Sequence, residues 1–440
     1  MTIESKIGVK IPEILLPIKE VDLTKWAVIA CDQFTSEPEY WDNVADLVGK
    51  SPSTLHMILP EVYLEKGDER DRIRNTQLKM QEYHQQGLFH KLTGLIYVER
   101  FVNGIPRKGL MVCLDLEAYD FSKGSQTLIR ATEGTIIDRL PPRIRIRENA
   151  LLEMPHILVL FDDPNHTVIS PILENKNEFN IYYDLDLMMD SGHLTGRFID
   201  NEDIINKVFS ALERLTDPDQ FTSKYDLQPG LSPLLFAMGD GNHSLATAKA
   251  IWEKNKIKLG LDHPSRYALV EIVNLHDPAL TFEPIHRILF NAKPDMLDSM
   301  TKFFNDRINA IPVPDMQQMI NLVNDQSSSE HAIGMITADG FTLITISNPE
   351  SNLPVGSLQS FLDKYIKDNP KTKIDYVHGQ EILNTVGTQP GNIGFYLAGM
   401  DKKQLFRTVI LDGALPRKTF SMGEAKEKRF YMECRFIRPI

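Results

Sequence analysis

LLFAMGDGNHSLATAKA, residues 234–250, is the stretch from which the fold of this chain can be predicted. It opens with an apolar run, Leu234–Met238, which has the length of a buried strand, and the Ala-rich segment after Ser244 has the composition of a helix. The two glycines between them allow the backbone to turn sharply. We therefore predict a strand, a tight polar turn and a helix, with Asn242 or Ser244 as the residue that caps the helix.

The turn itself carries groups that suit ligand chemistry. A helix N-terminus has unpaired N–H groups and a partial positive charge, so it is a natural seat for an anion. The sequence places an acid, Asp240, and an imidazole, His243, at this point, where open α/β sheets bind ligands. We take both as catalytic candidates, and Gly241, Asn242 and Ser244 as candidates for phosphate binding. The alternative is ordinary turn chemistry, in which Asp bends the loop and His bonds to a backbone carbonyl.

A second informative segment is RATEGTIIDRLPPRIRIREN, residues 130–149. Arg143, Arg145 and Arg147 alternate with isoleucines, which at strand spacing puts three guanidinium groups on one face. Arginine binds phosphate or carboxylate through two parallel hydrogen bonds. We predict an anion site that includes Arg139, Arg143 and Arg147. The alternative is a solvated strand edge that is protected by its charge.

Acids and a basic pair complete the set of candidates. Glu133 and Asp138 lie upstream of the arginines and are predicted to bind a metal, with Glu133 also a candidate base. His286 and Arg287 stand between apolar residues, where they either reach the anion site or mark an exposed strand end. The basic stretch at residues 415–429 is read either as a lid over a phosphate or as a solvated loop.

Composition limits the classes of protein to which the chain can belong. The chain has 440 residues, 42% of them hydrophobic, and a net charge of −12, which argues against nucleic acid as its main partner. Its three cysteines, Cys31, Cys113 and Cys434, are far apart, so a disulfide framework is not expected. The N-terminus does not resemble a signal peptide, and no apolar stretch has the length of a membrane span. We expect a cytoplasmic protein without a membrane partner.

The pattern along the chain predicts an α/β fold of mixed sheets flanked by helices. Strands are expected at 26–30, 155–161 and 266–274, and a hairpin joins 95–102 to 108–116 through Asn-Gly. Helices are expected at 68–87, 200–215, 291–308, 315–325 and 355–368. Because composition shifts near Phe290, we predict one α/β region at 1–290 and a C-terminal α/β lobe at 291–440.

Several motifs in this order resemble the family known as domain of unknown function 1015, DUF1015. They are RATEGTIIDRLPPRIRIREN, HILVLFDDP, GDGNHSLATAKA, LHDPALTFEPIHRIL, DYVHG and PRKTFSMGEAKEKR, and the likeness begins at CDQFTS, residues 31–36. The GDGNHS turn is also similar to the Gly-x-His-Arg signature of the ParB/sulfiredoxin-like superfamily. That resemblance implies a ParB/sulfiredoxin-like core, nucleotide binding and, in some members, phosphoryl transfer, including transfer to free serine.

Residue by residue, the likeness is partial. The family's turn reads D-G-H-H-R-Y, which Asp240, Gly241 and His243 match, whereas Asn242 and Ser244 replace its first His and its Arg. Arg143 or Arg147 can supply the charge that this Arg would carry. The family's other acid, its Asp-Arg pair and its Pro-x-His-Arg motif correspond to Glu133, to Asp138 with Arg139, and to His286 with Arg287.

These observations favour phosphoryl transfer to a small metabolite, such as one of the serine type, with Mg²⁺ and a nucleotide, ATP or ADP. Asp240 or Glu133 would orient the hydroxyl group or hold the metal, and Arg139, Arg143 and Arg287 would neutralise charge. Two alternatives stay open, a non-catalytic sensor of nucleotides or phosphorylated metabolites and a metal-assisted phosphoester hydrolase. The sequence leaves the oligomeric state open as well, with a homodimer as one option.

Overall fold

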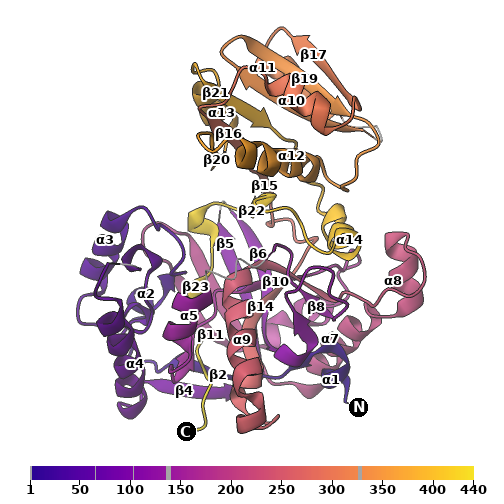
Figure 1. Ribbon diagram of the computed structural model, residues 1–440. Helices are drawn as coiled ribbons and strands as arrows, with labels where there is room; N and C mark the ends of the chain where they lie inside the picture. The colour runs from indigo at the N-terminus through magenta and orange to yellow at the C-terminus, as the bar shows by residue number, and fades with distance from the viewer. Residues whose placement is uncertain (1, 65, 103, 135–139, 326–329) are drawn as a thin grey trace. The chain divides into compact units, whose positions relative to one another are not determined.

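The computed structural model describes residues 2–64, 66–102, 104–134, 140–325 and 330–440 (Figure 1). The chain forms two compact units, one of Met1–Leu280 with Gly423–Ile440 and the other of Thr281–Met422. The polypeptide thus leaves the larger unit once and returns to it for its final segment, whereas the division expected from the sequence was a single one after residue 290. Among the described residues, no helix combines the length and the apolar character that crossing a membrane requires.

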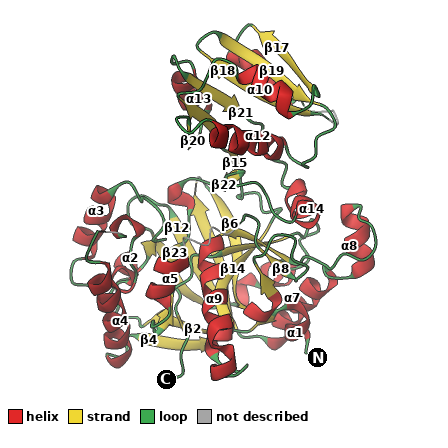
Figure 2. Cartoon of the chain, viewed as in Figure 1, coloured by secondary structure: helices red, strands yellow, loops and turns green. Residues whose placement is uncertain are grey.

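The larger unit is built on a ten-stranded mixed sheet (Figure 2). Its strands in spatial order are β11 (Ile181–Asp186), β12 (His193–Ile199), β5 (Leu95–Val102), β6 (Ile105–Asp115), β14 (Tyr267–Asn274), β10 (Leu158–Phe161), β13 (Phe236–Asp240), β8 (Ile129–Arg130) and β7 (Tyr119–Asp120), with β1 (Val9–Lys10) paired to β6. The β10–β14, β13–β8 and β7–β8 pairs are parallel and the other pairs are antiparallel.

Both faces of the central part of this sheet are buried: successive strand residues point to opposite sides, and in β5 residues on both sides are buried. Leu95 and Tyr97 belong to a core that also contains residues of α7 (Glu202–Arg214) and α9 (Asn242–Leu259). Ile96 and Val98 belong to the opposite core, with residues of α3 (Pro38–Val48) and α4 (Glu69–Gln85). The prediction of a mixed α/β fold with helices flanking the sheet is confirmed.

Shorter elements surround the large sheet. The helices are α1 (Ile3–Ile7), α2 (Leu23–Trp26), α5 (Leu140–Arg147), α6 (Ser170–Glu174), α8 (Pro218–Tyr225) and the 3₁₀ turns η1 (Thr54–Met57) and η2 (Glu61–Tyr63). The two-stranded sheets are β2 (Glu13–Pro17) with β4 (Phe89–Thr93), β3 (Val28–Ile29) with β23 (Phe430–Tyr431), and β9 (Leu152–Glu153) with β24 (Arg435–Phe436). The C-terminal segment therefore pairs with two strands from the first 153 residues of the chain.

The smaller unit contains a six-stranded sheet whose pairs are all antiparallel. Its order is β17 (Ile308–Val313), β19 (Gly340–Ile346), β18 (His331–Thr337), β21 (Asn392–Tyr396), β16 (His286–Phe290) and β20 (Lys373–Val377). The unit also holds α10 (Met296–Phe303), α11 (Met316–Asn324), α12 (Pro354–Asp368), α13 (Gln380–Gly387), α14 (Lys403–Asp412) and the pair β15 (Phe282–Pro284) with β22 (Phe420–Met422).

Two predicted elements are wrong. The helix expected at 291–308 is only Met296–Phe303, and Ile308–Val313 is an edge strand, where Pro312 costs no interior ladder bond. The arginine-rich segment expected as a strand is helix α5, which has Pro141 and Pro142 in its first turn, where proline removes no helical hydrogen bond.

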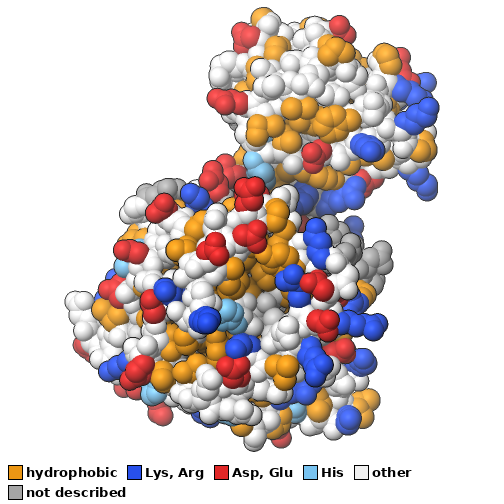
Figure 3. All heavy atoms as spheres, turned by 90° about the vertical axis from the view of Figure 1, so that its left-hand side faces the viewer, with side chains coloured by type: hydrophobic (Ala, Val, Ile, Leu, Met, Phe, Trp, Pro, Cys, Tyr) orange, Lys and Arg blue, Asp and Glu red, His pale blue; other side chains and the backbone are white. Residues whose placement is uncertain are grey.

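The surface of the larger unit mixes both signs of charge. On the face seen in Figure 3, acidic side chains are interspersed with basic ones over this unit. The net charge of −12 is therefore not carried on this face by one acidic patch.

Candidate functional site

The turn between β13 and α9 is folded as the sequence predicts, except for its cap. Gly241 has φ +80, and its Cα lies so close to Ile157 that an added Cβ would come within 3.0 Å of that side chain. Gly241 is itself the N-cap residue, and no side chain among the described residues caps it. Asn242 instead accepts a hydrogen bond from the backbone N–H of Thr132 at 3.3 Å. The positive N-terminal end of this 18-residue helix therefore lies at the turn without a side-chain cap from the described residues.

Asp240 is the charged centre of this turn. Its carboxylate accepts a hydrogen bond from the backbone N–H of Gly241 at 2.8 Å and forms an ion pair of 3.1 Å with Lys428. Burial favours the neutral acid, but the positive charge of Lys428 and the interaction with His156 outweigh it and lower the pKa of Asp240. Asp240 is therefore an ionised carboxylate at neutral pH.

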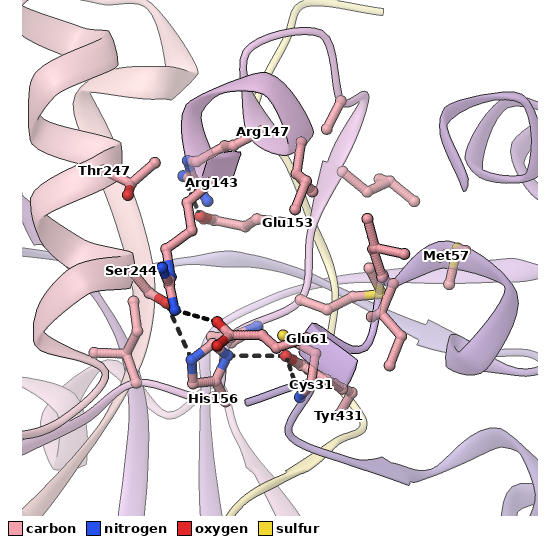
Figure 4. Close-up of a pocket in the computed structure, with 18 of the residues that line it drawn as sticks. Cys31, Met57, Glu61, Arg143, Arg147, Glu153, His156, Ser244, Thr247 and Tyr431 are labelled. Atoms are coloured by element: carbon pink, nitrogen blue, oxygen red, sulfur yellow. Dashed lines mark hydrogen bonds and ion pairs between the residues drawn. The ribbon is translucent and has the colours of Figure 1, made fainter. Parts of the chain in front are cut away.

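His156 connects the turn to the C-terminal segment (Figure 4). Its Nε2 atom lies 3.0 Å from Oγ of Ser244, in the first turn of α9, and its Nδ1 atom lies 2.9 Å from the hydroxyl oxygen of Tyr431 on β23. That hydroxyl accepts a hydrogen bond from the backbone N–H of Cys31 at 3.1 Å, and a carboxylate oxygen of Asp32 lies 3.7 Å from Nε2. The imidazole is therefore held at both ring nitrogens.

Arg145 of α5 points away from Arg143 and Arg147, because residues two apart on a helix lie on different sides. Arg143 and Arg147 are four residues apart, so they share a face of the helix, and both line a pocket of the larger unit. Arg143 pairs with Glu61, Arg145 with Glu69 at 2.6 Å, and Arg147 with the buried Glu153. Burial raises the pKa of Glu61, and the charge of Arg143 offsets this only in part. Of the three arginines, Arg143 is the one that Figure 4 shows beside Ser244 and His156.

The larger unit contains a pocket with a volume of about 140 Å³ (Figure 4). The polar end is formed by Arg143, Glu61, His156, Ser244 and Tyr431. The remaining wall is mostly apolar and comes from the segment around η1, from α4 and from the residues that join β9 to β10. The structure therefore brings Ser244, Arg143 and Arg147 to the lining of one pocket, and their role in phosphate binding stays a prediction.

His286 and Arg287 lie in the smaller unit, where their polar atoms are used locally. Arg287 is fully buried and donates to the backbone carbonyls of Arg417 at 3.0 Å and Lys418 at 2.9 Å. His286 is buried as well and accepts a hydrogen bond from the backbone N–H of Leu397 at 3.3 Å. Burial, together with the neighbouring Arg287, lowers the pKa of His286 to about 4. Both side chains act as structural groups of this sheet.

The remaining candidates are placed as follows. Glu133 and His243 are half-buried and are not among the residues that line the pocket. Asp138 and Arg139 lie outside the described residues. Within the described ranges, no group of three or more His, Cys, Asp and Glu side chains is arranged to hold a metal ion.

Sequence reasoning does not select His156, Tyr431 or Glu61, and it marks Lys428 only as one of several basic residues in the stretch 415–429. Lys428 belongs to the basic stretch that was read as a lid or a loop, and His156 opens the segment that was read only as a strand. No local sequence pattern predicts that Lys428 pairs with Asp240 or that His156 bonds to Ser244, because these contacts form only in the tertiary fold.

Comparisons with known proteins give a family and a set of distant structures. A search of curated proteins found no match. Among solved structures, a conserved hypothetical protein from Pyrococcus furiosus is 10% identical, with a TM-score of 0.35, over 73% of this chain and 90% of its own. A free serine kinase in complex with AMP is 10% identical, with a TM-score of 0.39, over 73% and 90%.

SbnI with a C-terminal truncation, from Staphylococcus aureus, is 9% identical, with a TM-score of 0.35, over 74% of this chain and 82% of its own. The family model of a protein of unknown function, DUF1015, matches residues 15–365, which include the β13–α9 turn and most of the pocket. This chain therefore belongs to the DUF1015 family.

Proposed function

We propose that this protein transfers a phosphoryl group to the hydroxyl group of a small metabolite at the β13–α9 turn. The observation that carries the proposal is the ion pair of 3.1 Å between Asp240 and Lys428 at the start of α9, where no described side chain caps the helix. An ionised acid and a cation then lie at a helix N-terminus, where a phosphate can bind and its charge can be neutralised.

The phosphate group would be held by the N-terminal N–H groups of α9, by Lys428 and by Arg143. Phosphoryl transfer depends mainly on positioning and on neutralising the charge of the phosphate oxygens, rather than on covalent catalysis. Lys428 reaches Asp240 directly, and Arg143 lines the pocket together with Ser244 of the first helical turn. Two cations from distant parts of the chain therefore take the place of the Arg that Ser244 replaces.

Asp240 would orient the attacking hydroxyl group. Its lowered pKa keeps it ionised, so it accepts a hydrogen bond from that hydroxyl over the whole neutral range. The hydrogen bond between Ser244 and His156 holds the first turn of α9, which follows Asp240 in the chain. His156 is thus a positioning residue for the first turn of α9.

A nucleotide is the proposed phosphoryl donor, and Mg²⁺ its proposed counter-ion. Magnesium binds one or two carboxylates together with the phosphates of a substrate, and does not need a full set of protein ligands. Asp240 and Glu61 are carboxylates of the right type at this site, although each is paired with a cation. Magnesium would neutralise phosphate charge there.

The proposal is tested first by binding. ATP, ADP and inorganic phosphate, each with and without Mg²⁺, should raise the melting temperature of the full chain, because any ligand of the native state stabilises it. Lys428→Met should abolish the shift. Lys426→Met is the matched control, since Lys426 is an exposed residue of the same segment, and it should leave the shift unchanged.

Turnover then separates an enzyme from a sensor. Incubation with ATP, Mg²⁺ and a panel of hydroxyl metabolites that begins with serine should give a phosphate monoester, detected by ³¹P NMR. Asp240→Asn should abolish product formation while phosphate binding persists. A nucleotide that binds through Lys428 but never yields product with any acceptor would identify a sensor and refute the transferase.

A further inference from the structure

We infer that the acceptor carries an apolar group about the size of a benzene ring, which lies in the pocket beside Ser244 while its hydroxyl group meets the β13–α9 turn. This inference rests on the proposed function and names its substrate class. It follows from the shape and lining of the pocket, of which phosphoryl transfer itself uses only the polar end.

Much of the lining of the pocket is apolar and comes from distant parts of the chain. Its side chains include Met57, Leu64, Met80, Ala150, Leu152 and Met154. Figure 4 shows Met57 on the far side of the pocket from Ser244. A ligand that spans the pocket therefore meets the charged groups beside Ser244 at one end and the thioether of Met57 at the other, and the Arg147–Glu153 ion pair also lines the pocket.

The size of the pocket separates it from ordinary packing. Protein interiors are close-packed and contain few voids larger than a water molecule. This pocket has a volume of about 140 Å³ and an apolar wall. An apolar cavity of about 150 Å³ stays dry and binds benzene. The space therefore fits a phenyl or branched alkyl group, and it is much larger than the side chain of serine requires.

The polar end fixes the direction in which such a ligand lies. Glu61, Arg143 and His156 all face this end, together with the Ser244 hydroxyl (Figure 4). A hydroxyl or phosphate group placed there keeps its hydrogen bonds, whereas an apolar group there would strip these charged side chains of water without replacing it. Three methionines in the apolar wall adapt to groups of different outline, so the preference is for size and apolar character.

The test compares product-like probes that share one head group. Methyl phosphate and phenyl phosphate differ only in the apolar substituent, and each is titrated against the full chain by calorimetry. We expect phenyl phosphate to bind at least about tenfold more tightly, because burial of several carbon atoms is worth more than one factor of ten. Benzene alone should also bind, as a rise in melting temperature.

Two variants enlarge apolar side chains that line the pocket. Ala150→Leu and Met154→Phe should each remove the preference for phenyl phosphate and abolish benzene binding, while methyl phosphate binds as before. Ala45→Leu is the matched control, since Ala45 is exposed on α3. Cooperative unfolding of each variant would show that it is folded. If one of the two variants does not fold, the other still tests the inference.

The outcomes separate this inference from the proposed function. If methyl phosphate binds in a manner that requires Lys428, but phenyl phosphate binds no more tightly and benzene does not bind, the apolar subsite is refuted and the transferase stands. If benzene binds and Ala150→Leu blocks it, but neither phosphate requires Lys428 or Arg143, the subsite stands and the phosphate site is refuted.

Discussion

Oγ of Ser244 lies 3.0 Å from Nε2 of His156, so the first turn of α9 is tied to the segment that precedes β10. The same imidazole bonds at 2.9 Å to Tyr431, a residue from the end of the chain. The His156 side chain thereby links its own segment to the start of α9 and to the C-terminal segment at the polar end of the pocket. The consequences of this and of other contacts can be measured.

Replacing His156 by Phe should loosen the pocket. The change keeps the ring but leaves the hydroxyls of Ser244 and Tyr431 without this partner, at a cost of about 1 to 3 kcal/mol in the free energy of unfolding. We expect phosphate to bind at least tenfold more weakly, because the start of α9 is no longer held. Urea denaturation and calorimetry measure the two effects. His90→Phe is the control, since His90 is exposed, and an equal loss in that variant would contradict the role of His156.

The Asp240–Lys428 pair should be visible in an acid titration. A carboxyl group whose folded pKa is below its unfolded value stabilises the protein above the unfolded pKa, and this contribution is lost as the pH falls through the folded pKa. For Asp240 that loss lies below pH 3.8. Lys428→Met removes the main favourable charge, so burial should then raise the pKa. A ¹³C NMR titration of the Asp240 carboxyl carbon measures the change, and a midpoint that does not move would show that Lys428 does not set it.

Arg429 should be far more important for stability than for ligand binding. It is buried between the carboxylates of Glu271 and Glu433, and Glu433 also accepts a hydrogen bond from Tyr183. Arg429→Met leaves Glu433 without this cation and leaves Glu271 with only its 3.8 Å pair to Arg107, which should cost about 3 to 5 kcal/mol in urea denaturation.

Adding Glu433→Gln to Arg429→Met should recover part of this loss, because one uncompensated charge is removed. Arg438→Met is the control, since Arg438 is exposed, and it should change the free energy of unfolding little. If Arg429→Met costs no more than the control, the cluster is not a stabilising unit.

The smaller unit should lose stability in mild acid. Burial lowers the pKa of both His286 and His331 from 6.5 to about 4. A histidine with a depressed folded pKa binds its proton in the unfolded state first, so its stabilising effect is complete above pH 6.5 and is lost as the pH falls towards 4. The slope should approach about 1.4 kcal/mol per pH unit for each histidine.

Denaturation at pH 7 and at pH 5 measures this slope for the unit formed by residues 281–422. His331→Gln, which can still bond to Ser357, removes one of the two titrating groups. It should reduce the pH dependence by about half, and a slope unchanged by this variant would exclude His331 as a source.

Local patterns in the sequence determined much of this protein. The apolar run before Asp240, the glycine at 241 and the Ala-rich segment after it were sufficient to predict β13 and α9, because hydrophobic period and backbone freedom act over a few residues. The same local reasoning failed for residues 143–147. Alternating Arg and Ile fits a strand, but residues 143–147 continue helix α5, which has two prolines in its first turn.

Only the tertiary structure decided which groups meet at the β13–α9 turn and in the pocket. Lys428 lies 188 residues beyond Asp240 in the chain, and Tyr431 lies 275 residues beyond His156, so no local pattern links the members of either pair. Their meeting depends on the return of residues 423–440 to the larger unit, where β23 pairs with β3. In the smaller unit, the buried guanidinium of Arg287 donates hydrogen bonds to backbone carbonyls, which the local sequence does not predict. Local sequence fixes the type of each chemical group, whereas long-range strand pairing and desolvation fix its neighbours and its charge.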